Sequence, residues 1–137
     1  MNELTVTAAV ENIEKVTVFV NEVLERLHCP TKALMQIDVA IDELLGNIAK
    51  YAYGVNSGDV TISLEISDDP KAVTVTFADG GIAYDPLSAA EPDVTLCAED
   101  RPIGGLGIYM VKKSMDEVSY RYENGKNILS IKKYIGG

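Results

Sequence analysis

Polar and apolar residues in the first half of the chain follow two different periods. The period is two over residues 3–7, whereas over residues 13–27 and 34–48 the apolar residues recur every three or four positions. Alternation is typical of a half-buried strand, and a spacing of about 3.6 residues indicates an amphipathic helix. The pattern therefore predicts a short strand followed by two helices. The first helix ends at Cys29-Pro30, and the second runs to about Tyr51.

The second half of the chain contains two pairs of short alternating segments and one further helix. The pairs are residues 60–66 and 73–77, joined by a turn at 68–70, and residues 118–122 and 129–131, joined by Asn124-Gly125. Each pair is expected to form a hairpin. A helix is expected from about Gly107 to Met115, after a long segment with few periodic signals. Loops of that length in small domains are usually functional or mobile.

The order of these elements predicts the fold class. Strand, two helices, hairpin, long loop, helix and hairpin favour a two-layer α+β sandwich. Three helices would cover one face of a mixed, mostly antiparallel sheet. A doubly wound parallel fold is disfavoured because strands and helices do not alternate. With 137 residues, the chain suits a single domain over residues 1–137.

The composition excludes several classes of partner. The chain has 12 basic and 21 acidic residues and a net charge of -9, which argues against general binding to nucleic acids or anionic membranes. It has no secretory start and no apolar run of membrane-spanning length. We therefore expect a cytoplasmic protein in which Cys29 and Cys97 are reduced thiols.

A polar stripe lies beside the apolar stripe of the second predicted helix. Glu43 and Asn47 are four positions apart and share a face, which Gln36 and Lys50 extend. A carboxylate there can accept a proton, and an amide oxygen can ligate a hard cation such as Mg²⁺. The alternative is an ordinary solvated helix face.

A second candidate site follows the strand that ends near Phe77. In the run Asp79-Gly80-Gly81, the carboxylate can accept a hydrogen bond from an amino group such as that of adenine. The two glycines would let the backbone approach a flat ligand closely. The alternative is an ordinary Asp-Gly turn.

A third candidate is the glycine-rich run that opens the third helix. Gly104, Gly105 and Gly107 would leave backbone amides available to phosphate oxygens at a helix N-terminus. The run has neither the Walker A ending nor the dinucleotide spacing. The alternative is a flexible hinge.

Taken in order, the three runs resemble the motifs of one ATPase superfamily. Residues 38–53 look like the Glu-x-x-x-Asn box of the superfamily that unites gyrase, the heat-shock chaperone, histidine kinases and the mismatch-repair protein. Asp79-x-Gly81-x-Ala83 and residues 104–111 resemble its second and third boxes. Residues 84–87 and 115–118 look most like the anti-sigma factor serine/threonine kinases. The resemblance covers nearly the whole chain.

The resemblance implies a Bergerat-type, histidine kinase-like ATPase fold that binds ATP and Mg²⁺ under a mobile lid. It implies that Glu43 acts as the base toward the attacking hydroxyl, that Asn47 holds Mg²⁺ and that Asp79 binds the adenine amino group. The other residues that it places around ATP are Lys50, Gly81, Ala83, Arg101, Gly104, Gly105, Leu106 and Gly107. The family tends to have a threonine just after the last hairpin turn, where this chain has Lys126 and Asn127.

The resemblance also implies partners. An anti-anti-sigma factor would be phosphorylated, an RNA polymerase sigma factor would be sequestered, and two copies of the chain would form a homodimer. One alternative is a non-catalytic ATP-binding module that regulates a partner protein. Another, an isolated histidine-kinase ATPase domain, is disfavoured because the only histidine, His28, is expected at a helix end.

Overall fold

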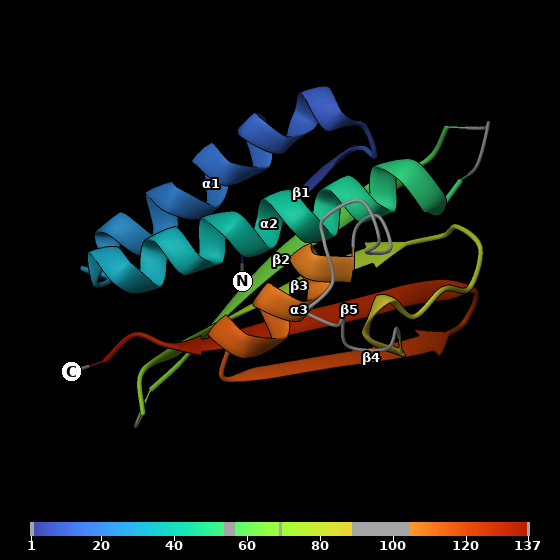
Figure 1. Ribbon diagram of the computed structural model, residues 1–137. Helices are drawn as coiled ribbons and strands as arrows, with labels where there is room; N and C mark the ends of the chain where they lie inside the picture. The colour runs from blue at the N-terminus through green and yellow to red at the C-terminus, as the bar shows by residue number, and fades with distance from the viewer. Residues whose placement is uncertain (1, 54–56, 69, 89–104, 137) are drawn as a thin grey trace.

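The computed structural model describes residues 2–53, 57–68, 70–88 and 105–136. Within these residues, five strands form one sheet in the order β1-β2-β3-β5-β4 (Figure 1). The strands are β1 (Asn2–Thr7), β2 (Asp59–Ser67), β3 (Ala72–Asp79), β4 (Glu117–Glu123) and β5 (Lys126–Tyr134). All four neighbouring pairs are antiparallel, so the described sheet has none of the parallel pairing that a mixed sheet would contain.

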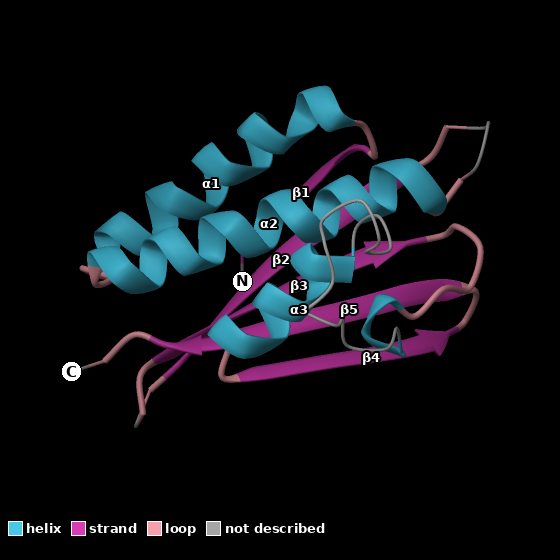
Figure 2. Ribbon diagram, viewed as in Figure 1, coloured by secondary structure: helices cyan, strands magenta, loops and turns pink. Residues whose placement is uncertain are grey.

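The three α-helices of the described residues lie on one face of this sheet (Figure 2). They are α1 (Ile13–Arg26), α2 (Thr31–Tyr51) and α3 (Gly105–Ser114), and short 3₁₀ turns occupy Val10–Asn12 and Pro86–Ser88. Helix α2 contacts both α1 and α3 and therefore runs through the middle of the helical layer. The predicted two-layer α+β sandwich is confirmed, with α3 beginning two residues earlier than expected.

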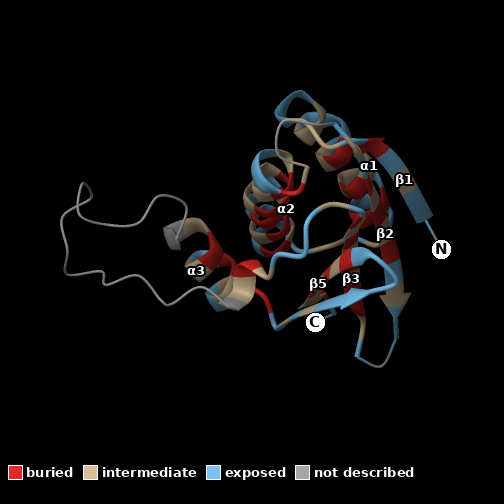
Figure 3. Ribbon diagram, turned by 90° about the vertical axis from the view of Figure 1, so that its right-hand side faces the viewer, coloured by how far each residue is buried: buried red, intermediate tan, exposed pale blue. Residues whose placement is uncertain are grey.

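Alternation along the central strands sets the inner face of the sheet. Every second residue of β3 from Val73 to Phe77 is buried under the helices, and Leu129 and Ile131 of β5 are buried beside them (Figure 3). The same alternation places Asp79 and Asn127 on the inner face, where they are only 4% and 6% exposed. They are cross-strand partners at one end of the β3–β5 pair. Two polar side chains thus extend an otherwise apolar layer.

The connection between α1 and α2 is a tight left-handed turn. His28 has φ of 56°, and its amide donates a hydrogen bond to the Glu25 carbonyl, as expected for a residue just beyond a helix C-terminus. The thiol of Cys29 is free, and partial burial raises its pKa above the ordinary value. The second cysteine, Cys97, lies outside the described residues.

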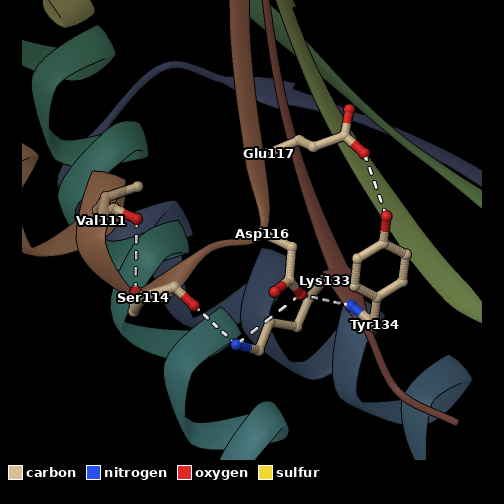
Figure 4. A network of polar contacts seen from close by, with 6 residues as sticks. All are labelled: Val111, Ser114, Asp116, Glu117, Lys133 and Tyr134. Carbon is tan, nitrogen blue, oxygen red and sulfur yellow. Dashed lines mark hydrogen bonds and ion pairs between the residues drawn. The ribbon is translucent and has the colours of Figure 1, made fainter.

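The C-terminal end of α3 is tied to the sheet by one lysine. The Nζ of Lys133 donates a hydrogen bond of 2.7 Å to the carbonyl of Ser114, the last residue of α3 (Figure 4). The same Nζ lies 3.9 Å from Asp116, whose carboxylate accepts the backbone N–H of Tyr134 at 2.7 Å. A cation also suits the negative end of the helix dipole. This contact holds one end of α3 in place relative to β5.

We expect Lys133→Ala to destabilise the fold by about 1–2 kcal/mol, because a carbonyl at the end of α3 loses a charged donor. The matched control is Lys132→Ala. Its side chain is 32% exposed, against 16% for Lys133, and pairs with Glu117 at 3.5 Å, so its loss should cost less than about 1 kcal/mol. Urea denaturation measures both variants. Equal midpoints would show that the Lys133 contact adds nothing to stability.

Candidate functional site

Two neighbouring hollows lie along the C-terminal half of α2. The inner pocket lies between α2 and the sheet, with apolar walls that include Ile48 and Leu129, and Asp79 and Asn127 also line it. The outer groove is lined by α2 residues together with Val10 and Ile13. Asn47 lines both hollows and so stands where they meet.

Asp79 is the buried carboxylate of the inner pocket. Its Oδ1 accepts hydrogen bonds from the Gly81 backbone N–H at 2.9 Å and from Asn127 Nδ2 at 3.0 Å. Within the described part of the chain, no donor contacts Oδ2. A carboxylate oxygen among apolar walls favours a ligand that offers it a donor. The Asp79 side chain thus holds the segment that follows it through one oxygen, and the other oxygen has no donor among the described residues.

Gly81 is required by its contact with α2. A Cβ at this position would overlap the main chain of Ala52, just beyond the end of α2. The adjacent amide of Ile82 donates to the Ala52 carbonyl at 2.7 Å. Gly81 thus allows a close approach of the protein's own backbone, and its expected approach to a ligand stays a prediction. Ala83 is exposed and lies between Ile82 and Tyr84, both of which line the inner pocket.

Helical spacing brings Glu43, Asn47 and Lys50 together in the outer groove, as the sequence predicts. The Nδ2 of Asn47 donates to the Glu43 backbone carbonyl at 3.2 Å. No donor in the described residues reaches Asn47 Oδ1, so this oxygen is available to a cation. With Asp42 also in the lining, the groove carries two carboxylates and one lysine.

Glu43 lies against the first turn of α3. A Cβ on Gly107 would overlap the Glu43 carboxylate, so a larger residue at this position would require the Glu43 side chain to move. The first amides of a helix have no partner within the helix, and its dipole favours negative charge there. The polar stripe of α2 and the glycine-rich run that opens α3 are therefore in contact. Gly105 opens α3, whereas Arg101 and Gly104 lie outside the described residues, and no side-chain position is described for Leu106.

Sequence reasoning did not assign Tyr51, Tyr84, Tyr120 and Asn127 to this site. The Tyr51 and Tyr84 rings line the inner pocket with centroids 5.8 Å apart. The Tyr120 hydroxyl donates to Asn127 Oδ1, and desolvation raises the pKa of Tyr120, which keeps the hydroxyl protonated. Two features of the sequence could have indicated these residues. Tyr51 is next to Lys50, and Asn127 follows the last hairpin turn, where the family tends to have threonine.

Tyr53 joins the end of α2 to the strands behind the pocket. Its hydroxyl accepts the Gly80 amide at 2.8 Å and donates to the Asp59 carbonyl at 2.6 Å. Desolvation raises the pKa of Tyr53 above its ordinary value, so the hydroxyl can serve as a donor at neutral pH. These contacts hold the Asp79-Gly80-Gly81 turn next to α2.

The described residues contain no cluster of three or more histidine, cysteine or acidic side chains that could hold a metal ion. A cation near Asn47 would therefore need further oxygens from a ligand such as a phosphate chain. No helix within the described ranges is both long and apolar enough to cross a bilayer.

A family model and several known proteins are similar to this chain. The family model described as "Histidine kinase-like ATPase domain" matches residues 6–133. A serine-protein kinase RsbW from Bacillus cereus is 26% identical over 137 residues, covering 97% of this chain and 84% of the relative. The RsbW of Listeria monocytogenes is 30% identical over 109 residues, covering 76% and 68% of the two chains.

A solved structure shows the same fold. It contains the RsbU and RsbW domains of Rv1364c from Mycobacterium tuberculosis and superposes with a TM-score of 0.68 at 15% identity. The match covers 98% of this chain and 33% of the solved one, so the chain spans about a third of that protein. The resemblance drawn from the three motifs is confirmed at the level of the family.

We expect Gly81→Ala to destabilise the protein by about 1–3 kcal/mol, because the new Cβ overlaps the Ala52 main chain. The control is Gly46→Ala on α2, where a Cβ meets nothing within 4 Å. That change should stabilise the helix by about 0.5–1 kcal/mol. Thermal unfolding shows whether each variant has a lower or a higher unfolding temperature than the wild type. Two shifts in the same direction would contradict the packing described for Gly81.

Proposed function

Because the chain belongs to the histidine kinase-like ATPase family, we propose that it is an ATP-dependent serine/threonine protein kinase that acts as an anti-sigma factor. One observation carries the proposal. The α2 residues Glu43 and Asn47 line a groove that adjoins the apolar pocket of Asp79, and the first turn of α3 contacts Glu43. A site for the adenine ring, a site for the phosphates and a proton acceptor would thus lie side by side.

We assign the adenine ring to the inner pocket. Its apolar walls suit a flat purine, and the Tyr51 and Tyr84 rings offer faces for aromatic packing. The Oδ2 of Asp79 would accept a hydrogen bond from the exocyclic amino group. Gly81 and Ala83 would position the turn at the edge of the base.

The outer groove fits the phosphates. Asn47 Oδ1 would contribute one ligand to Mg²⁺, which would neutralise phosphate charge when bound. Lys50 would approach the phosphates from α2, and the backbone N–H groups at the start of α3, from Gly105 to Gly107, would donate hydrogen bonds to phosphate oxygens. We also propose that the phosphates are contacted by Arg101, Gly104 and Leu106. The net charge of -9 makes such local neutralisation necessary.

Glu43 would be the proton acceptor in the transfer. Phosphoryl transfer depends on in-line placement and charge stabilisation more than on covalent chemistry by the protein. The half-buried Glu43 carboxylate lies near the groove where the terminal phosphate would end. It would take the proton of a serine or threonine hydroxyl as the hydroxyl attacks that phosphate.

The proposed partners come from the family. The two relatives described above are named serine-protein kinases, which supports a protein as the phosphate acceptor. We assign this role to an anti-anti-sigma factor and the sequestered role to an RNA polymerase sigma factor. The proposal includes a homodimer and a cytoplasmic location. The rival function is a non-catalytic ATP-binding module, which would bind ATP and leave its partner unmodified.

We expect Glu43→Gln to retain ATP binding and to lose phosphoryl transfer by about a hundredfold or more, because the amide cannot accept the proton. Glutamine keeps the size of the side chain beside Gly107. The control is Asp42→Asn, which removes a neighbouring carboxylate of the same groove. Mass spectrometry of a candidate anti-anti-sigma protein incubated with Mg-ATP measures transfer. Full activity of Glu43→Gln would remove Glu43 from this role, and no transfer by the wild type would favour the non-catalytic module.

We expect Asp79→Asn to weaken ATP binding by about tenfold or more with little loss of stability, because Oδ2 is the acceptor assigned to the adenine amino group. Asparagine is similar in size and can keep its oxygen toward the Gly81 amide. Its NH₂ group would then face the amino group of the base. Isothermal titration with ATP measures the effect, and unchanged affinity would reject the adenine assignment.

A further inference from the structure

Asn127 is a buried amide with an unusually complete set of partners. Its Nδ2 donates to Asp79 Oδ1 at 3.0 Å and to the Ile82 carbonyl at 2.9 Å. Its Oδ1 accepts the Tyr84 amide at 3.0 Å and the Tyr120 hydroxyl. A side-chain amide has two N–H donors and two acceptor lone pairs. Every one of these is used within the protein, so Asn127 has no hydrogen bond left to offer a ligand.

The partners also determine how the amide group is oriented. Reversing it would place the carbonyl oxygen against two acceptors, Asp79 Oδ1 and the Ile82 carbonyl. The NH₂ group would then face the Tyr84 N–H. Neither pairing forms a hydrogen bond, and unpaired polar groups in a buried position are costly. The environment therefore keeps the donor of Asn127 directed at Asp79.

The Nδ2 donor of Asn127 restricts the orientation of the Asp79 carboxylate. Two N–H groups, from Asn127 and Gly81, hold Oδ1, and the carboxylate cannot rotate without losing both bonds. The oxygen left for a ligand is Oδ2. A purine with an amino group at the facing position satisfies it, whereas a purine with a carbonyl there presents a second acceptor and is rejected.

We propose that Asn127 is a positioning residue that fixes the Asp79 carboxylate and thereby makes the pocket select an amino-bearing purine over its keto analogue. The proposal rests on the proposed function, since it concerns the same nucleotide site. In terms of probes, the protein binds ATP in preference to ITP, which differs from ATP by having a carbonyl in place of the adenine amino group. Asn127 acts on this choice through Asp79 and without touching the base.

The test is isothermal titration of the full chain with Mg-ATP and with Mg-ITP, for the wild type and for Asn127→Asp. The substituted carboxylate would face Asp79, and the two acids would repel each other or share a proton, which removes the oriented acceptor. We expect the wild type to prefer ATP by about tenfold or more, the gain expected from a hydrogen bond to a charged group. In Asn127→Asp the ATP affinity should fall toward that of ITP, so that the preference is lost.

A second pair elsewhere in the protein provides the matched control. Asn21 Nδ2 donates to Asp38 Oδ1 at 2.7 Å between α1 and α2, and neither residue lines the inner pocket. Asn21→Asp should lower the unfolding temperature, as Asn127→Asp also should, but it should leave the ATP preference unchanged. Asn127→Ala is the second variant, used if Asn127→Asp does not give the circular dichroism spectrum of the wild type.

The outcomes distinguish failure of the proposed function from failure of the proposed purine selectivity. A wild type that binds neither nucleotide overturns the proposed function and this proposal with it. A wild type that binds ATP and ITP equally overturns the selectivity alone. Retention of the wild-type preference in a folded Asn127 variant shows that Asn127 does not position Asp79, and failure of both variants to fold makes it a purely structural residue. Loss of the preference in the Asn127 variant, with no loss in Asn21→Asp, supports the proposal.

Discussion

The proposed nucleotide site depends on a carboxylate that continues the apolar face of the sheet. Asp79 follows Val73, Val75 and Phe77 in the alternation of β3, and this places a charged group where the fold otherwise buries hydrocarbon. Such a group is tolerated only with hydrogen-bond partners, because burial without them is costly. Asn127 and the Gly81 amide supply partners to one oxygen. The polarity of the pocket thus follows from the strand register.

Helix α2 connects this pocket to the groove where chemistry would occur. Its inner side supplies the core residues Ile41, Leu44 and Leu45, and the adjoining side carries Glu43 and Asn47. The N-terminal turn of α3 lies against Glu43, and Lys133 holds the C-terminal end of α3. A rigid long helix and a shorter helix anchored at one end therefore position groups from two distant parts of the chain. Such positioning by two helices suits a phosphoryl-transfer site, where the placement of the reacting groups matters more than covalent chemistry by the protein.

Periodicity accounts for how much of this was predictable from sequence. Among the described elements, alternation predicted the five strands and helical spacing predicted α1 and α2, because both patterns reflect burial on one face. Helix α3 was expected from its place in the order of elements, without such a stripe. The four-residue spacing of Glu43 and Asn47 likewise predicted their shared groove. The contact between Glu43 and Gly107 was not predictable from spacing, since it depends on how α2 and α3 pack. The roles assigned to these residues remain predictions.

Asn127 shows why the rest could not be inferred. The sequence predicts the β2–β3 and β4–β5 hairpins from their turns, but no turn joins β3 to β5, so nothing local indicated that Asp79 would face Asn127. Nothing local in the sequence indicated the contact between Gly81 and Ala52 either. Both cases involve contacts between segments far apart in the chain, whose register is set by tertiary packing.

The most direct test of the central claim is a crystal structure of the chain with Mg²⁺ and a non-hydrolysable ATP analogue. The account predicts the adenine in the inner pocket with its amino group hydrogen-bonded to Asp79 Oδ2. It also predicts the metal on Asn47 Oδ1 and the terminal phosphate between Glu43 and the start of α3. A nucleotide bound elsewhere, or an adenine whose amino group does not contact Asp79, would contradict it.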